Sequence, residues 1–537
     1  MTMGLRAAGQ IEGNGLSRII AGPRAWLGLI GLTVLTRLPA LLYPRAIDDE
    51  AVYGVVARVM LAGGLPYRDA IERKPPLLFL VYWAVFRMFG AYNWLALHWL
   101  AAAWVLLTMA GLFSIAQRLG GRRAGMFAAL AYALVQPWAT AKNLAFNGEM
   151  LMNLPLVWAY ALILPTRRAH IFAPLLAPVL AGVLLALAFL LKQPAAIAAV
   201  PLGLYLLCAP LRRKDRNWSG SIGQAGALTA GFAAMLGGAA AILWHNGLLG
   251  EAWYWTLADH GVPHIFWLHA AEHTALFLLF ALPLWLPLLA WQSLRQAWRG
   301  REAELCTVLG WLAVSVVGAA AGGRFYPHYY IQIVPPLAVL AGVFHARQND
   351  RGDDPTGMAR PLCLSHRVGG LSLRFAGLWL AAAAVVSLCV QSWQLLGERA
   401  PSAAGNYVRT HAKPTGRLFV WGQQTPFYID AGILPASRYI ASFPLTGYIF
   451  GGDLPGVSTR DRIVPGAWQN LASDLRRQPP QFIIDTQATP GDTYPMRDFP
   501  WLARYVASVY RRTAVFADGT VYQRAIVQPI ESRPIGR

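Results

Sequence analysis

The stretch WLGLIGLTVLTRLPALLYPRAIDDE, residues 26–50, decides the class of fold. Its first part, residues 26–42, is an apolar run that is too long for a typical signal-peptide core and approaches the roughly 20 residues of a membrane-spanning helix. Arg18 and Arg24 precede it, and no convincing small-residue cleavage site follows. We therefore expect a retained first span with the N-terminus inside. The adjacent acids Asp48, Asp49 and Glu50 follow shortly after the outer end of this span.

The composition is that of a polytopic membrane protein. Of 537 residues, 56% are hydrophobic and 13% are charged, an apolar excess that a soluble domain does not show. The net charge of +20 comes from arginines in short clusters between apolar runs, which is typical of cytoplasmic loops and not of a nucleic-acid-binding face. Nucleic acid is excluded as a partner. The four cysteines show no CxxC spacing, so no disulfide or redox site is expected.

Apolar runs long enough to cross a membrane predict about eleven helices. They lie near residues 25–43, 94–117, 124–141, 146–165, 171–191, 194–211, 223–246, 274–292, 304–322, 329–346 and 374–396. The run 77–89 is too short to span, and leaving it out keeps the basic loops on the cytoplasmic side. These loops carry Arg122, Arg123, Arg167, Arg168, Arg212, Arg213, Lys214, Arg295, Arg299, Arg301 and Arg347. We interpret 77–89 as a juxtamembrane helix.

This topology predicts three parts. Residues 1–24 form a cytoplasmic tail, residues 25–396 a transmembrane domain whose first loop, 44–93, lies outside, and residues 397–537 a small exoplasmic α/β domain. Strands are expected at RLFVWG, at QFIID and on both sides of ADGT. The expected fold class is a polytopic α-helical membrane protein of about eleven spans with a C-terminal α/β domain.

The three acids admit two readings. Asp48 can cap the helical pattern AVYGVVARVMLAGG, with Asp49 and Glu50 in its first turn, because acids stabilise helix N-termini. One acid suffices for a cap, however. Adjacent carboxylates near a membrane repel one another and bind a proton more tightly, which suits a base for a hydroxyl group. We favour the functional reading.

Other charged residues at outer helix ends are candidates for substrate binding. Lysine is rare here, yet Lys74 precedes the run 77–89 and Lys192 ends the fifth span. Lys192 could snorkel to the headgroups or bind a phosphate at membrane depth. Arg324 and His328 in GRFYPHYY lie at another outer helix end and could also bind substrate. The guanidinium group of Arg324 suits a bidentate contact with phosphate. Glu149 in AFNGEM is either a helix cap or a second functional acid.

The loop WYWTLADHGVPHIFWLHAAEH contains histidines among aromatic residues. The aromatic residues are typical of a membrane interface. His260 and His264, spaced i, i+4, could bind a divalent metal, but Gly261 and Pro263 argue against the helix that this spacing needs. No cofactor is required by any other motif, and this metal site is a weak candidate.

Several of these stretches in order resemble one family. DEAVYGVVARVMLAGGLPYRDAIERKPPL, NGEM, FLLKQPA and GRFYPHYYIQIVPPLAVLAG are similar to landmarks of the C-type membrane glycosyltransferases, in particular the protein mannosyltransferase and lipid A aminoarabinose transferase group, over residues 20–345. The resemblance implies transfer of a sugar, with inversion, from a polyprenyl-phosphate donor to an acceptor on the outer face of the membrane.

The resemblance also implies roles for single residues. The family's DExxY motif falls on Asp49, Glu50 and Tyr53. Asp49 is then the catalytic acid, its neighbours Asp48 and Glu50 are further catalytic candidates, and Tyr53 is a candidate for substrate binding. Lys74 and Lys192 match residues that hold the donor phosphate, and Glu149 falls near a second acid. The aminoarabinose transferases have an acid directly before the lysine that corresponds to Lys74, whereas this chain has Arg73 there. This difference argues against a metal site built from such an acid and a loop histidine.

We therefore expect an inverting glycosyltransferase of a bacterial inner membrane, with its C-terminal domain in the periplasm. Its partners would be a polyprenyl-phosphate sugar, membrane lipids and an acceptor, which could be lipid A, a polysaccharide or a protein. A transporter or flippase of lipid-linked sugars is the main alternative. It predicts ionisable groups near mid-membrane, of which this sequence has very few, and inverted repeats, which we do not find. A noncatalytic scaffold would leave the acids and Lys192 unexplained.

Overall fold

A computed structural model describes residues 22–164, 175–213, 217–258, 265–352, 373–397, 400–448, 458–487 and 494–525. The chain divides into two compact units. The first contains residues up to Glu50 and Arg73–Arg399, and the second contains Ala51–Glu72 and Ala400–Arg537. The second unit thus includes part of the segment that the sequence analysis assigns to the first loop.

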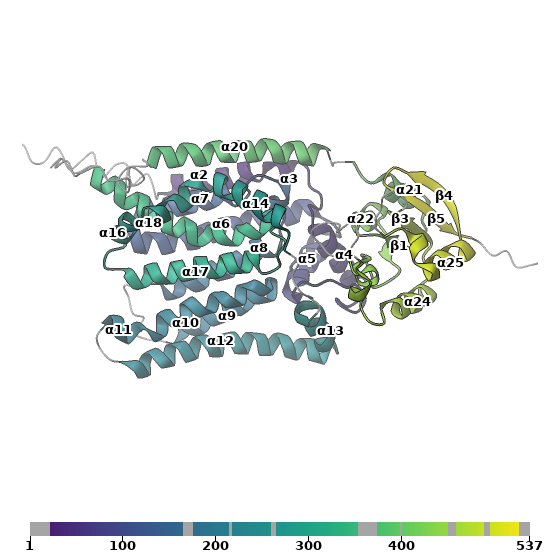
Figure 1. Cartoon of the computed structure of the whole chain (residues 1–537), viewed down its shortest axis with the longest axis horizontal. Coiled ribbons are helices and arrows are strands. Elements are labelled where there is room, and N and C mark those ends of the chain that lie inside the picture. Colours follow the sequence, from purple (N-terminus) through teal and green to yellow (C-terminus); the bar gives the residue numbers. More distant parts are fainter. Residues whose placement is uncertain are drawn as a thin grey trace, which may run out of the picture. The chain divides into compact units, whose positions relative to one another are not determined.

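Helices are the regular elements of the first unit in its described residues (Figure 1). Its helices are α2 (Pro23–Thr36), α3 (Leu38–Leu42), α5 (Pro76–Phe89), α6 (Trp94–Gly120), α7 (Arg122–Val135), η1 (Ala141–Leu144), α8 (Gly148–Ile163), α9 (Leu176–Leu191), η2 (Gln193–Ala198), α10 (Ala199–Leu207), α11 (Ala209–Arg213), α12 (Trp218–His245), α13 (Leu249–Trp253), η3 (Tyr254–Ala258), α14 (Trp267–Phe280), α15 (Leu282–Leu289), α16 (Trp291–Ala297), α17 (Glu302–Ala320), η4 (Pro327–Ile333), α18 (Val334–Gly352) and α20 (Leu373–Gly397).

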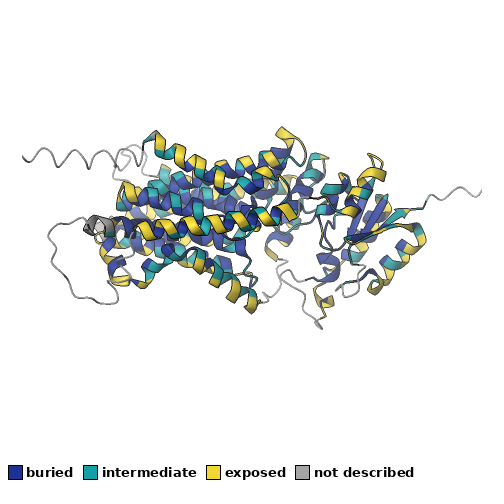
Figure 2. Cartoon of the chain, turned by 90° about the horizontal axis from the view of Figure 1, so that it is seen from above, coloured by how far each residue is buried: buried dark blue, intermediate teal, exposed yellow. Residues whose placement is uncertain are grey.

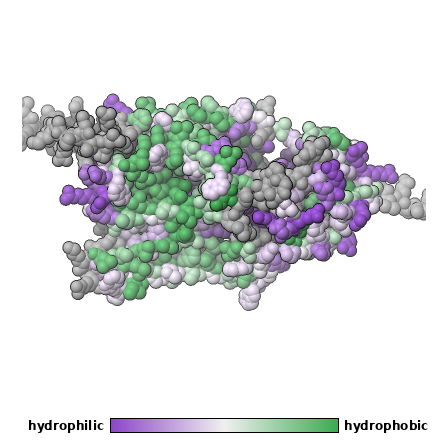
Figure 3. Space-filling view, viewed as in Figure 1, coloured by the Kyte–Doolittle hydropathy of each residue, from purple (hydrophilic) through white to green (hydrophobic). Residues whose placement is uncertain are grey.

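Five helices among the described residues are long and apolar enough to span a membrane, or six if the bent pair α14 and α15 forms one span. They match the spans expected near residues 94, 223, 304, 329 and 374. Space-filling Figure 3 shows apolar residues over much of the helical unit. The protein is therefore a multi-pass membrane protein, as predicted.

The count of eleven spans stays a prediction, because several expected spans are not single long helices. The run near 25–43 is broken at Arg37 into α2 and α3, and the run near 194–211 is divided among η2, α10 and α11. The run near 274–292 bends by 92° between α14 and α15. Prolines 39, 194, 283 and 287 lie in these runs, and proline interrupts helical hydrogen bonding. Apolar length alone does not reveal such breaks.

The second unit contains the α/β structure expected at the C-terminal end. Its elements are α4 (Glu50–Leu61, which begins at the last residue of the first unit), α21 (Ala403–His411), β1 (Arg417–Trp421), α22 (Pro426–Ala431), β2 (Leu434–Pro435), α23 (Phe443–Thr446), η5 (Arg460–Arg462), α24 (Ala467–Arg477), β3 (Phe482–Asp485), η6 (Met496–Asp498), α25 (Pro500–Val509), β4 (Tyr510–Phe516) and β5 (Gly519–Arg524). The strands predicted at RLFVWG, at QFIID and around ADGT are confirmed.

These strands form one sheet in the order β2-β1-β3-β5-β4. β1 pairs in parallel with β2 and β3, while β5 pairs antiparallel with β3 and β4. Every residue of β3 is buried, as expected for a central strand covered on both faces, and Figure 2 shows buried residues in this sheet. Residues 51–72 join the unit through the backbone, where Ile71 N donates to Arg438 O at 2.9 Å.

Candidate active site

The three acids of the first loop have three different environments. Asp48 Oδ1 lies 3.2 Å from Lys142 Nζ, and Asp49 Oδ2 lies 3.7 Å from Lys74 Nζ. Asp48 has a φ of 53°, a left-handed conformation that is uncommon for residues other than glycine and turns the chain between the two carboxylates. The acids therefore do not form one repelling cluster. Two of them form separate ion pairs at the surface of the site.

Glu50 differs from its neighbours because it is fully buried. Its Oε2 accepts from Ile47 N at 2.8 Å, and its Oε1 accepts from Phe146 N at 2.6 Å. Burial raises the pKa of Glu50 to about 8, against the opposing effect of these two backbone hydrogen bonds. Glu50 thus caps its own turn and joins it to the segment before α8. This geometry does not favour the catalytic role predicted for Glu50.

A buried polar network holds the segment between α7 and α8. Arg37, almost fully buried, donates to Leu144 O, and Gln136 Nε2 donates to Asn143 O at 2.8 Å. From α20, Gln394 Oε1 accepts from Ala141 N at 2.7 Å. Buried polar groups that are satisfied in this way fix a unique backbone path. The segment therefore presents Lys142 and the start of α8 in a defined position.

Glu149 and Lys192 form the most buried ion pair of the site. Lys192 Nζ lies 2.9 Å from Glu149 Oε1, and their side chains are 10% and 1% exposed. A Cβ atom on Gly148 would come within 2.8 Å of Lys192 Cδ, so glycine permits the close approach of the lysine. Within the described residues, Glu149 Oε2 accepts no hydrogen bond. The pair thus keeps one buried acceptor for a further donor.

The turn between α17 and η4 adds aromatic and basic residues. Lys142 Nζ lies 5.9 Å from the centre of the Tyr326 ring, and Lys192 Nζ lies 5.2 Å from that of Tyr329, both within cation–π distance. His328 is buried and stacks on Tyr326 at a centroid distance of 5.7 Å. Arg324 is half-buried in the same turn, next to Phe325, whose φ is 52°.

Electrostatic interactions connect these groups into one site. Lys192, His328 and Lys74 lie close enough to Glu149 to interact with it electrostatically. The charges of Glu149, Asp49 and Asp48 in turn act on His328. The structure therefore brings the predicted Asp48, Asp49, Lys74, Glu149, Lys192 and His328 together within the helical unit. Tyr53 is buried on α4, in the second unit.

The sequence analysis missed Lys142. It is half-exposed, with 50% of its side chain accessible, and it lies in AKNLAFNGEM, directly before the motif that contains Glu149. The chain has five lysines, of which Lys74, Lys142 and Lys192 lie in this site. The rarity of lysine, which pointed to the other two, was a signal that could also have found Lys142.

A metal site is not evident in the described residues, where no group of three histidine, cysteine, aspartate or glutamate side chains could hold an ion. His260 and His264, the predicted weak candidates, lie outside the described residues. His273 comes from the same stretch of sequence but lies on α14, and its Nδ1 is 2.7 Å from Phe325 O. That histidine therefore contacts the turn before η4.

Solved structures share this fold. ArnT from Cupriavidus metallidurans bound to undecaprenyl phosphate is similar with a TM-score of 0.58 at 16% identity, over 93% of this chain and 98% of ArnT. The archaeal oligosaccharyltransferase AglB from Archaeoglobus fulgidus, in complex with an inhibitory peptide and a dolichol-phosphate, gives 0.51 at 13% identity, over 94% and 75%. The chain therefore has the fold of these membrane glycosyltransferases, and the fold that the motif resemblance implied is confirmed.

A family model gives a more particular match. Residues 73–244 match the family of dolichyl-phosphate-mannose-protein mannosyltransferases. The matched segment contains Lys74, Lys142, Glu149 and Lys192. No curated protein sequence matches the chain.

Proposed function

We propose that this protein is an inverting glycosyltransferase that moves a sugar from a polyprenyl-phosphate donor to an acceptor on the outer face of a bacterial inner membrane. The observation that carries the proposal is the meeting of three lysine–carboxylate pairs in the helical unit, Asp48 with Lys142, Asp49 with Lys74 and Glu149 with Lys192. Cations for a phosphate leaving group and a carboxylate for a nucleophile are the two requirements of such a transfer.

The donor phosphate would bind Lys74 and Lys192, with Arg324 as a further contact. The related ArnT and AglB structures contain undecaprenyl phosphate and dolichol-phosphate, which supports a polyprenyl phosphate here. An ammonium group gives a compact charge that neutralises a departing phosphate. Because Lys74 pairs with Asp49 and Lys192 with Glu149, a bound phosphate would compete with both carboxylates for their lysines.

Asp49 is the proposed base. Its side chain is 37% exposed, so an acceptor can reach it, and a phosphate that takes over Lys74 would leave its carboxylate more basic. Asp49 would then accept the proton of the acceptor nucleophile as it attacks the sugar from the face opposite the phosphate. A single displacement of this kind inverts the anomeric carbon without a covalent intermediate.

The remaining residues would position the substrates. Asp48, held by Lys142, keeps a negative charge next to Asp49. Glu149 and His328 would contact the donor, since Glu149 Oε2 is a buried acceptor that suits a sugar hydroxyl. We assign Glu50 to positioning, because both of its oxygens accept backbone hydrogen bonds. Tyr53, buried on α4, would act with it in fixing the start of that helix.

The proposal is tested by following radiolabelled sugar from the polyprenyl-phosphate pool of membranes that contain the wild type or Asp49→Asn. Asp498→Asn is the matched control, because Asp498 is exposed and lies far along the chain in η6. We expect label to reach protein, glycolipid or polysaccharide with the wild type and the control, and not with Asp49→Asn. The labelled fraction identifies the acceptor class.

A transporter of lipid-linked sugars would give a different result. Label would then change sides of the membrane but stay in the polyprenyl-phosphate pool, with acceptor shown to be present. A fully active Asp49→Asn variant would remove Asp49 from the proposal. Equal amounts of inserted, monodisperse protein in all samples exclude loss of folding as the cause.

A further inference from the structure

The second unit contains a cavity of about 190 Å³ between residues 59–69 and the α/β fold. Its wall includes Gly63 and Gly64 on one side and the end of β2 and of α24 on the other. Gly63 has a φ of 88° with open space where a side chain would begin, and a Cβ atom on Gly64 would come within 2.6 Å of Val59 Cγ1. Gly63 therefore makes the turn and adds no side chain to the cavity, and glycine at position 64 permits close packing against Val59.

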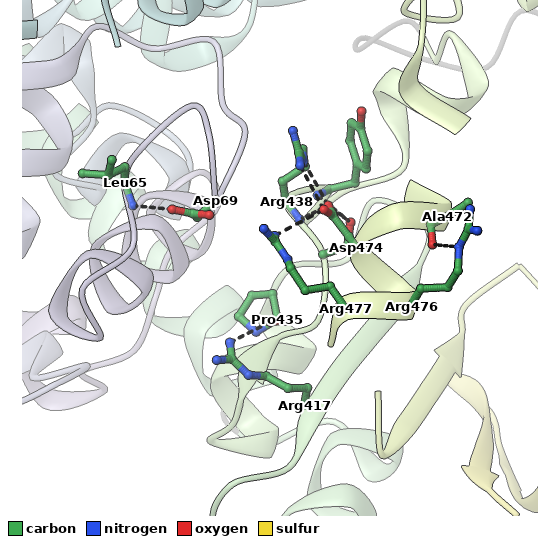
Figure 4. A network of polar contacts seen from close by, with 11 residues as sticks. Leu65, Asp69, Arg417, Pro435, Arg438, Ala472, Asp474, Arg476 and Arg477 are labelled. Carbon is green, nitrogen blue, oxygen red and sulfur yellow. Dashed lines mark hydrogen bonds and ion pairs between the residues drawn. The ribbon is translucent and has the colours of Figure 1, made fainter. Parts of the chain in front are cut away.

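Three arginines line this cavity, namely Arg417, Arg438 and Arg477. The buried carboxylate of Asp474 holds two of them, because Arg438 Nη2 lies 2.9 Å and Arg477 Nη2 lies 3.5 Å from Asp474 Oδ1. Figure 4 shows these side chains together, with Asp69 facing them. One carboxylate shared by two guanidinium groups leaves a positive charge at the wall.

Arg417 adds a cation that Asp474 does not compensate. Its Nη1 donates to Pro435 O at 3.1 Å, and no carboxylate in the described part of the chain forms an ion pair with it. Burial lowers the pKa of Arg417 from its ordinary value. A half-buried guanidinium with only a carbonyl partner retains N–H donors for an oxyanion.

Asp69 gives the cavity a second chemical character. Its Oδ2 accepts from Leu65 N at 2.9 Å, which fixes the carboxylate at the wall, and carboxylate oxygens can accept further hydrogen bonds. A bare oxyanion would be repelled by Asp69. A ligand that carries hydroxyl groups next to its oxyanion satisfies both the carboxylate and the arginines.

We propose that this cavity binds a saccharide unit that carries a phosphate or a carboxylate group, with the oxyanion on Arg417 and Arg477 and sugar hydroxyls on Asp69. The volume suits one sugar-sized group. All residues of this site belong to the second unit, whereas the residues of the lysine site belong to the helical unit. It goes beyond the proposed transfer reaction, and its test needs no transferase activity.

The test measures binding of glucose 6-phosphate, glucuronate and glucose to the purified full chain in neutral detergent by calorimetry. We expect saturable binding of the two anionic sugars and at least tenfold weaker binding of glucose, because a charge-assisted hydrogen bond to arginine is lost. Arg417→Gln should weaken glucose 6-phosphate binding about tenfold, and Arg477→Gln, whose side chain is 62% exposed, about threefold.

Arg476→Gln is the matched control. It removes the same charge from the same helix, but Arg476 Nε donates to Ala472 O at 3.1 Å and the residue does not line the cavity. We expect affinity within twofold of the wild type. Equal weakening by Arg476→Gln and Arg477→Gln would mean a nonspecific charge effect and would overturn the proposal. Equal binding of glucose and glucose 6-phosphate, or no saturable binding of either anion, would overturn it as well. Should Arg417→Gln not fold, Arg477→Gln on the exposed helix end decides the outcome.

Discussion

The lysine site of the helical unit and the arginine cavity of the second unit use positive charge in different ways. In the lysine site each ammonium pairs with its own carboxylate, and the pairs range from Glu149–Lys192, nearly buried, to Asp48–Lys142, with half of the lysine exposed. In the cavity one buried carboxylate, Asp474, serves two arginines. The ammonium group of lysine is a compact charge that suits a contact with one carboxylate. The planar guanidinium group of arginine has several N–H donors, so two arginines can bind the same carboxylate. Because a buried charge depends on its partner more than an exposed one does, we expect the contribution of each pair to follow the burial of its carboxylate.

The largest expected effect is on catalysis and tests the partly exposed pair Asp49–Lys74 of the lysine site. Asp49→Asn should lower the transfer rate by about 10²–10⁴-fold, the usual contribution of a general base. Thermal stability in detergent should hardly change, because Asp49 and Lys74 are 3.7 Å apart and partly exposed. A variant that loses activity together with its fold would show that Asp49 is structural instead.

The second effect is on stability and tests the buried pair Glu149–Lys192 of the lysine site. Lys192→Met should destabilise the protein by about 3–5 kcal/mol, because it leaves the buried Glu149 carboxylate without its cation. Unfolding in detergent measures this change. The double variant Lys192→Met/Glu149→Gln is the control and should recover most of the stability. If the single variant is as stable as the wild type, burial does not determine how much the Glu149–Lys192 ion pair contributes to the free energy of unfolding.

A third prediction concerns the pH dependence of stability. The pKa of Glu50 is about 8 in the folded protein, against an ordinary value of 4.5 that applies to the unfolded chain, so the folded protein binds this proton more tightly than the unfolded chain does. Protonated Glu50 therefore adds a few kcal/mol to the free energy of unfolding below pH 4.5, and this stabilisation is lost as the pH rises toward 8. Glu50→Gln should remove this slope, measured as the unfolding temperature between pH 5 and 8.5.

Glu272→Gln, in which an exposed carboxyl of α14 is replaced, should retain the slope of the wild type. A Glu50→Gln variant with an unchanged slope would assign the pH dependence to other groups.

The smallest expected effect concerns the most exposed pair. Lys142→Gln should change the free energy of unfolding by less than about 1 kcal/mol, because half of the lysine side chain is exposed and the pair is screened by solvent. Lys413→Gln, an exposed lysine of the second unit, is the control. A loss comparable to that of Lys192→Met would contradict the ranking by burial.

Part of the candidate site was predictable from local sequence alone. Asp49, Lys74, Glu149 and Lys192 lie at ends of apolar runs, where a charged residue is a candidate for function, and the family motifs indicated the same positions. The pairing among them was not predictable, since Lys142 and Asp48 are 94 positions apart. The burial of Glu50 was not predictable either, because the three adjacent acids look alike in the sequence, and only the folded chain shows that a distant backbone amide, Phe146 N, donates a hydrogen bond to Glu50.

The sequence by itself determined the class of this protein, because apolar runs and the sign of the charges between them dictate which segments enter a membrane. It also determined the strands of the second unit, through the apolar pattern of RLFVWG and QFIID. Only the tertiary structure decided which lysine meets which carboxylate, and that residues 51–72 join the sheet-containing unit. Both depend on contacts between segments far apart in the chain, which no local pattern encodes.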